Sequence, residues 1–213
     1  MDPLRRRTDK IRKILRSAYP DVKTALAHRN PFELLVATIL SAQTTDRQVN
    51  SVTEALFDRF PTAAHLAAAP LGEIEALIRP TGFFHNKARN IKACARALAE
   101  QHDGRVPADL DALTRLPGVG RKTANVVLGA AFGIPGMVVD THVKRVAGRL
   151  GLTTHSDPVK IEYDLMPLVP KSAWHTFGLQ LIHFGRDVCR ARKPACPDCP
   201  LHPLCPYPDK TGA

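Results

Sequence analysis

The chain has 213 residues, 44% of them hydrophobic and 23% charged, and 30 Lys and Arg against 20 Asp and Glu give a formal net charge of +10. This length suits one large domain or two modest ones, and the composition excludes a disordered tail protein. Residues 126–139 form the longest segment without a polar side chain, but three glycines and Pro135 interrupt it, which excludes a membrane span. The N-terminus is basic with no apolar segment behind it, so we expect no secretion.

The positive charge favours a polyanionic partner, with nucleic acid first and an anionic membrane second. Half of it lies in residues 1–16, where seven basic and two acidic residues give +5. A charge run of this kind usually forms a solvated helix face, so it points to DNA only if an independent signal appears.

The segment around Asn30 predicts the start of a buried helix. Asn30 suits the N-cap, Pro31 the first helical position, and Glu33 the positive helix end. Residues 32–40 are apolar almost all round, as expected of a central helix. Thr45 and Gln48 then fit a capping box that opens a helix to about residue 60.

The rest of the chain also favours helices. We expect them over residues 63–69, 71–79, 86–102, 108–115, 121–132, 141–150, 158–168 and 172–184. No segment shows the sustained alternation of a half-buried strand. After Lys193 prolines and cysteines alternate, so the sequence predicts an all-α protein with an irregular C-terminal loop.

Residues 116–124 (LPGVGRKTA) predict a tight hairpin between two helices. Gly118 and Gly120 let the backbone turn around Val119 and approach a ligand closely. The following helix start, with Arg121, offers unsatisfied N–H donors to a phosphate. A plain helix–helix turn is the alternative, but with an apolar hairpin tip at Val119 and the basic balance we favour phosphate binding.

Lys122 lies in the first turn after this hairpin. A neutral lysine amine can attack a sugar carbon and form a Schiff base. The positive helix end, the neighbouring Arg121 and partial burial would favour loss of its proton. A simple phosphate contact remains the alternative.

Asp140 precedes a predicted helix and suits its N-cap. One carboxylate oxygen can cap while the other faces a substrate, where it would stabilise positive charge.

Four cysteines form the pattern Cys189-x6-Cys196-x2-Cys199-x5-Cys205, and Cys94 stands alone in a helix as a small buried hydrophobe. Clustered cysteines in an intracellular chain indicate a metal, and the spacing alone leaves zinc open.

These motifs together resemble those of the helix-hairpin-helix DNA glycosylases, most closely the endonuclease III family. The resemblance rests on LPGVGRKTAN at 116–125 and VDTHV at 139–143, and it extends from LSAQ at 40–43 through GFF at 82–84 to the terminal cysteines. It therefore covers nearly the whole chain.

The resemblance implies an all-α helix-hairpin-helix DNA glycosylase fold with the active site between two helical domains. Residues 22–132 would form the DNA-binding hairpin domain. Residues 1–21 and 133–213 would form a discontinuous iron–sulfur domain, in which Cys189, Cys196, Cys199 and Cys205 hold a [4Fe–4S] cluster. The cluster would fix the proline-rich loop, so that Arg192 and Lys193 meet phosphate on a rigid surface.

The same resemblance assigns roles in the reaction. Lys122 would be the nucleophile, and Asp140 would stabilise the sugar and assist proton transfer. Because a nearby carboxylate favours a protonated amine, we expect the two not to be tightly paired when DNA is bound. Gln43 would fill the gap left by the rotated nucleotide, and Phe83 or Phe84 would insert between bases. His142 would lie near the sugar, with a packing role as the alternative.

We therefore expect a monomeric, bifunctional DNA glycosylase and AP lyase of base excision repair, cytoplasmic and nucleoid-associated, with no membrane partner. It would excise oxidised pyrimidines from double-stranded DNA and cleave at the resulting abasic site by β-elimination. One alternative is a monofunctional glycosylase on the same scaffold, although such enzymes typically lack the lysine. Another is a non-catalytic iron–sulfur DNA-binding protein, against which Lys122 and Asp140 both argue.

Overall fold

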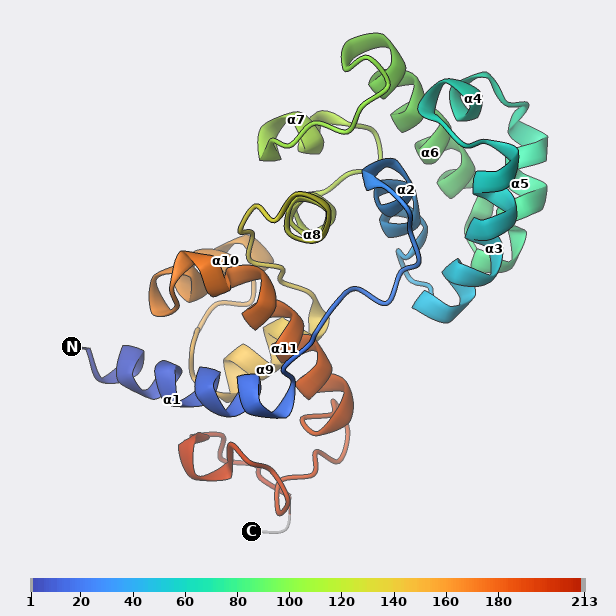
Figure 1. The fold of residues 1–213 in the computed structure, drawn as a ribbon. Coiled ribbons are helices and arrows are strands. Elements are labelled where there is room, and N and C mark those ends of the chain that lie inside the picture. Colours follow the sequence, from blue (N-terminus) through green and yellow to red (C-terminus); the bar gives the residue numbers. More distant parts are fainter. Residues whose placement is uncertain (1, 212–213) are drawn as a thin grey trace. The chain divides into compact units, whose positions relative to one another are not determined.

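The computed structural model describes residues 2–211, and these form helices and turns with no strand among them. They divide into two compact units (Figure 1). One unit is Thr24–Ile134, and the other joins the segment up to Lys23 to the segment from Pro135 onward. The limits expected from the sequence, 22 and 132, differ from these by two residues. No helix within the described range is long and apolar enough to cross a membrane.

The unit Thr24–Ile134 is built around one helix. Its elements are α2 (Pro31–Leu40), α3 (Asp46–Arg59), α4 (Ala63–Ala68), α5 (Leu71–Ile78), the 3-10 turn η1 (Arg79–Thr81), α6 (Phe84–Gln101), α7 (Leu110–Arg115) and α8 (Arg121–Phe132). Every side chain of α2 after Pro31 is buried, and the helix contacts α3, α6 and α8. This confirms the central helix that the apolar sequence predicts.

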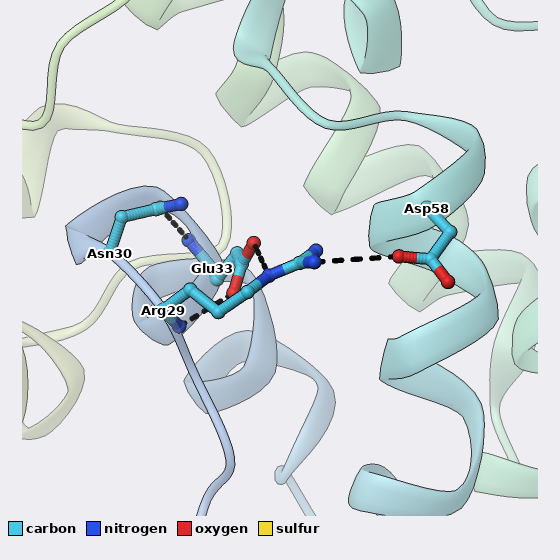
Figure 2. Close-up of polar contacts among 4 residues, drawn as sticks. All are labelled: Arg29, Asn30, Glu33 and Asp58. Atoms are coloured by element: carbon cyan, nitrogen blue, oxygen red, sulfur yellow. Dashed lines mark hydrogen bonds and ion pairs between the residues drawn. The ribbon is translucent and has the colours of Figure 1, made fainter.

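The start of α2 is held by side chains that are close in sequence. The Asn30 Oδ1 accepts from the N–H of Glu33 at 3.0 Å, as the cap prediction requires. The buried Glu33 carboxylate accepts from the Arg29 backbone N–H at 2.7 Å and from its Nε at 2.8 Å. Arg29 also reaches Asp58 of α3 at 3.5 Å (Figure 2), so the buried charge is compensated and α2 is tied to α3.

The second unit packs an N-terminal helix against helices from the C-terminal part of the chain. Its elements are α1 (Pro3–Ala18), α9 (Thr141–Arg149), α10 (Pro158–Leu165), α11 (Trp174–Asp187) and the 3-10 turns η2 (Met166–Leu168), η3 (Lys171–Ala173) and η4 (His202–Leu204). The helix α11 contacts both α1 and α9. Ile11 and Leu15 of α1 are fully buried, while its opposite face exposes five cations: Arg5, Arg6, Lys10, Lys13 and Arg16.

Arg7 is a basic residue of α1 with a structural role. Its guanidinium donates to the backbone carbonyls of Leu150 at 2.8 Å, Gly151 at 3.0 Å and Leu204 at 3.1 Å. It therefore links α1 to the end of α9 and to η4. Part of the N-terminal charge thus stabilises the fold.

Several helix limits differ from the predictions for identifiable reasons. The helix expected at residue 86 begins at Phe84, because Phe83 turns the chain with a left-handed backbone. The helix expected over 158–168 ends at Leu165 and continues as η2, where Pro167 lacks the N–H that an α-helix needs. The helix expected to end at residue 184 continues to Asp187.

The capping box at α3 is only half formed. The Thr45 hydroxyl accepts from the N–H of Gln48 at 3.3 Å. The reciprocal bond, from the Thr45 backbone N–H to the Gln48 Oε1, is not formed, and the Gln48 Nε2 donates to the Ser51 hydroxyl at 3.0 Å. The helix start was predicted correctly, but the reciprocal bond was not.

Candidate functional site

The hairpin between α7 and α8 turns where the two glycines predict it, but the glycines have different roles. Gly118 has a φ of +75°, and a Cβ there would lie 2.9 Å from the Asn90 Cβ. Gly120 is extended, with a φ of −91°, and has no atom within 4 Å of where its Cβ would be. Val119 between them is buried in the core, so the hairpin does not present an apolar tip.

The first turn of α8 has an open N-terminus. Gly120 is its N-cap, and a glycine has no side chain that could accept a hydrogen bond from the first turn. The space beside Gly120 gives an incoming anion access to backbone donors and to the positive end of the helix dipole. This is the local geometry of a phosphate site.

Lys122 lies in this first turn with an exposed side chain. The expectation of partial burial was therefore wrong: the second helical residue points away from the core that Ala124 and Asn125 enter. Within its own unit it makes no hydrogen bond or ion pair with a described residue. Its amine is thus sterically accessible at a helix end that disfavours positive charge.

Asp140 is the N-cap of α9, as predicted. One oxygen, Oδ1, accepts from the backbone N–H of His142 at 2.8 Å and of Val143 at 2.9 Å. The half-buried carboxylate is thereby fixed, and Oδ2 has no hydrogen bond within the unit. The arrangement separates a structural oxygen from an oxygen that remains able to contact a ligand.

His142 is packed and oriented by its neighbours. A Cβ on Gly185 of α11 would lie 3.0 Å from the His142 Cβ, so the two helices approach closely here. The Arg145 Nη2 lies 3.2 Å from the His142 Nδ1. Because a guanidinium only donates, Nδ1 accepts and Nε2 carries the proton of the neutral ring.

Gln43 and Phe83 share an uncommon backbone conformation. Their φ values are 55° and 48°, in the left-handed region that costs a non-glycine residue about 1 kcal/mol or more. Both side chains are exposed, and Phe83 is 69% exposed. Phe84 instead packs against the core and its ring lies 4.1 Å from that of His85. The structure thus separates two phenylalanines that the sequence leaves equivalent.

Lys87 is a functional candidate that the sequence analysis missed. It lies on α6, is 5% exposed, and its Nζ donates to the Thr44 hydroxyl at 2.6 Å and to the Thr81 carbonyl at 2.9 Å. Burial lowers the pKa of its amine. Its position on the apolar face of α6, four residues before the buried Ile91, was an available signal.

The four C-terminal cysteines line one cavity in the second unit. Its walls also include Leu150, Phe184 and Tyr207, and the four are Cys189, Cys196, Cys199 and Cys205. Across residues 2–211 no three His, Cys, Asp or Glu side chains are grouped so as to hold a single metal ion. Thiols placed around a shared cavity suit a larger cluster, because its irons each bind one thiolate. Cys94 is buried elsewhere, and burial raises its pKa to about 12.

The loop between the first two of these cysteines has a fixed backbone and exposed cations. Arg149 donates to the carbonyls of Arg190 at 2.7 Å and Ala191 at 3.1 Å. Arg192 and Lys193 are exposed on this loop, and Lys193 has a φ of 50°. Lys193 is therefore, after Gln43 and Phe83, the third predicted DNA-contact residue with a left-handed backbone.

Comparison with known proteins connects these features. Residues 36–171 match the model of the HhH-GPD superfamily base excision DNA repair proteins. Endonuclease III of Synechocystis sp. is 53% identical, over 95% of this chain and 93% of the relative. Two solved structures, a non-covalent endonuclease III–DNA complex and a trapped endonuclease III–DNA covalent intermediate, each show 46% identity and a TM-score of 0.91, with 95% of both chains covered.

Proposed function

The chain belongs to the endonuclease III family of HhH-GPD superfamily base excision DNA repair proteins, and from this premise we propose how its own residues carry the reaction. It is a DNA glycosylase with AP lyase activity. Its substrates are oxidised pyrimidines and abasic sites in double-stranded DNA, which it binds as a monomer. The observation that carries the proposal is the accessible Lys122 amine at the open start of α8.

Lys122 is the nucleophile. Its neutral amine forms a bond to C1′ of the damaged nucleotide while the bond from C1′ to the base breaks, and the proton that the attacking nitrogen loses passes to the departing base. The sugar ring then opens, O4′ takes up a proton from solvent, and the nitrogen and C1′ form a protonated Schiff base. Removal of a C2′ proton then expels the 3′ phosphate, which is β-elimination and cuts the strand.

Asp140 stabilises the positive charge that develops on the sugar and assists proton transfer at Lys122. Its Oδ1 already accepts the two backbone hydrogen bonds at the start of α9, so Oδ2 is the oxygen that faces the sugar in this proposal. His142, whose Nε2 carries a proton, contributes a donor near the sugar or its phosphate.

The duplex is bound mainly through its phosphates. The turn at Gly118 and Gly120 offers backbone donors, and Arg121 adds a full charge beside them. Arg192 and Lys193 add charges on the C-terminal loop. None of these groups reads a base, so they suit an enzyme that finds damage in any sequence.

Gln43 and Phe83 occupy the duplex when the damaged nucleotide rotates out. The Gln43 amide pairs with the orphaned base, and Phe83 enters the stack. We choose Phe83 over Phe84 because Phe83 is 69% exposed whereas Phe84 packs against the core.

Cys189, Cys196, Cys199 and Cys205 hold a [4Fe–4S] cluster, whose iron–thiolate bonds crosslink the C-terminal loop. Purified protein is expected to be brown with a broad visible absorbance. Cys199→Ala should lose both colour and iron, whereas Cys94→Ala should keep them. We place the protein in the cytoplasm, associated with the nucleoid.

Borohydride trapping tests the reaction. The wild type should form a covalent adduct with a duplex that contains thymine glycol or an abasic site. Lys122→Ala should lose this adduct by at least about 10³-fold, as expected for removal of a nucleophile. Lys160→Ala removes a comparable exposed lysine from the first turn of α10 and should trap normally. Undiminished trapping by Lys122→Ala, or none by the wild type, would contradict the assignment.

A further inference from the structure

Two loops of the unit Thr24–Ile134 are joined by a compact hydrogen-bond network. The Thr44 hydroxyl donates to the Thr81 carbonyl at 2.6 Å, and Lys87 donates to both of these groups. The Thr81 hydroxyl continues the network by donating to the Ile78 carbonyl at 2.8 Å. The loop between α2 and α3 is therefore fixed to the turn between α5 and α6.

A lysine is a costly residue at such a position. Lys87 is 5% exposed and lies on the same face of α6 as the buried Ala88 and Ile91. Burial of an amine disfavours its charged form, and an apolar side chain would fill the volume without this penalty. The geometry indicates what the lysine provides, since a donor from α6 can hold two acceptors on two different loops.

The two fixed points lie next to the residues that enter the duplex. Thr44 directly follows Gln43, and Thr81 precedes Phe83 by two residues. Both Gln43 and Phe83 have left-handed backbones, which persist only where the surroundings hold them. An insertion from two loops also needs their separation set before binding, because ordering them on the DNA would cost affinity.

We propose that Lys87 is a positioning residue, which fixes the Gln43 loop and the Phe83 turn at the spacing needed to open a damaged duplex. This inference rests on the proposed function, specifically on insertion of Gln43 and Phe83. It assigns Lys87 no part in bond breaking, since it acts only through the two loops.

The test compares Lys87→Met with Lys92→Met. Lys92 lies one and a half turns further along α6 and donates to the Ala69 carbonyl, away from both loops. Base unstacking is measured with 2-aminopurine placed beside a tetrahydrofuran abasic analogue in a duplex, at saturating protein. Lys87→Met should reduce this fluorescence rise about tenfold. It should also reduce, by a similar factor, the rate of borohydride trapping on a duplex that contains a true abasic site, as expected for misplaced binding groups. Lys92→Met should leave both unchanged.

Single-stranded abasic DNA separates positioning from chemistry, because it has no stack to open. Lys87→Met should trap this substrate within about twofold of the wild-type rate, since Lys122 is untouched. Equal losses on single and double strands, or no loss on either, would overturn the inference. Failure of wild-type trapping on both substrates would instead overturn the proposed function.

Thr44→Val provides a second route if Lys87→Met does not fold. It removes the hydroxyl with little change in volume and should produce the same selective loss on duplex DNA. In the double variant the two effects should be less than additive, because both residues act through one network. Full additivity would show that they act separately and would overturn the proposal.

Discussion

The helices α8 and α9 begin in opposite ways. At α8 the N-cap is Gly120, which has no side chain to accept from the first turn. At α9 the N-cap is Asp140, whose Oδ1 accepts from the backbone N–H groups of His142 and Val143. Both starts carry the same kind of unsatisfied donors and the same positive dipole end, but one is open and the other is closed by an internal anion.

Under the proposed function, this difference would let one structural feature, a helix N-terminus, serve two functions. The open end of α8 has donors left for a phosphate from outside the chain, so it suits binding. The closed end of α9 uses its donors to fix a carboxylate, so it suits catalysis that needs a negative charge at a defined place. Loss of the anion from one end, or addition of a side chain to the other, should therefore produce separable defects.

Among substitutions of the two N-cap residues, the largest effect is expected at Asp140, from a comparison of Asp140→Asn with Asp140→Ala. Asparagine is as good an N-cap as aspartate, so Asp140→Asn should unfold at nearly the wild-type temperature. It lacks the charge, and turnover of a thymine-glycol duplex should fall about 10²- to 10³-fold. Asp140→Ala should lose the same activity and also about 1 kcal/mol of stability, measured by urea unfolding.

Normal turnover by Asp140→Asn would contradict the separation of the capping role of Asp140 from its catalytic role. The carboxylate would then be only a cap, and α9 would have no chemical role. A variant that lost stability as well as activity would show that the negative charge itself, rather than its hydrogen bonds, stabilises the helix start.

At the open end, substitution of the two hairpin glycines should have different effects on folding stability and on DNA affinity. Gly118→Ala places a side chain on a backbone with a φ of +75° and 2.9 Å from the Asn90 Cβ, so it should cost about 2 kcal/mol or more of folding free energy. Gly120→Ala meets no atom within 4 Å and should cost less than about 1 kcal/mol. Its methyl group would enter the space open to a phosphate, so DNA affinity should fall while stability is nearly kept.

These two effects are measured by urea unfolding and by fluorescence anisotropy with a labelled duplex. Equal losses of stability in both variants would mean that the hairpin is built symmetrically around its two glycines. Normal affinity in Gly120→Ala would mean that the open end of α8 does not bind phosphate.

Helix starts that depend on neighbouring residues were predicted correctly. The start of α2 at Asn30 and the caps at Thr45 and Asp140 follow from residue type and position alone. A cap is made by a side chain and by backbone groups two or three residues away, so no tertiary information is needed. The burial of α2 could also be predicted from its own residues, because its sequence has no polar face.

Contacts between distant residues were not predictable. The burial of Lys87 could have been predicted from the apolar face of α6, but its hydrogen bonds to Thr44 and Thr81 could not, because the spacing of these residues in sequence gives no sign of their contact. The burial of Val119 depends on the core around α2 and α8, so the hairpin sequence suggested an apolar tip instead. The left-handed backbone at Phe83, which moves the start of α6, is likewise set by the turn around it.

The smallest effect on DNA affinity is expected from substitution of Lys193. It tests whether side-chain charges and backbone donors differ in the salt dependence of their phosphate contacts. Lys193→Gln removes one cation, so the slope of log affinity against log salt should decrease by about 0.9. Gly120→Ala removes no charge, so it should lower affinity at every salt concentration with an unchanged slope. Lys193→Gly relieves the left-handed backbone at a φ of 50° and should match Lys193→Gln in slope if the contact depends on charge. A steeper loss for glycine would show that the fixed conformation of this loop also contributes to binding.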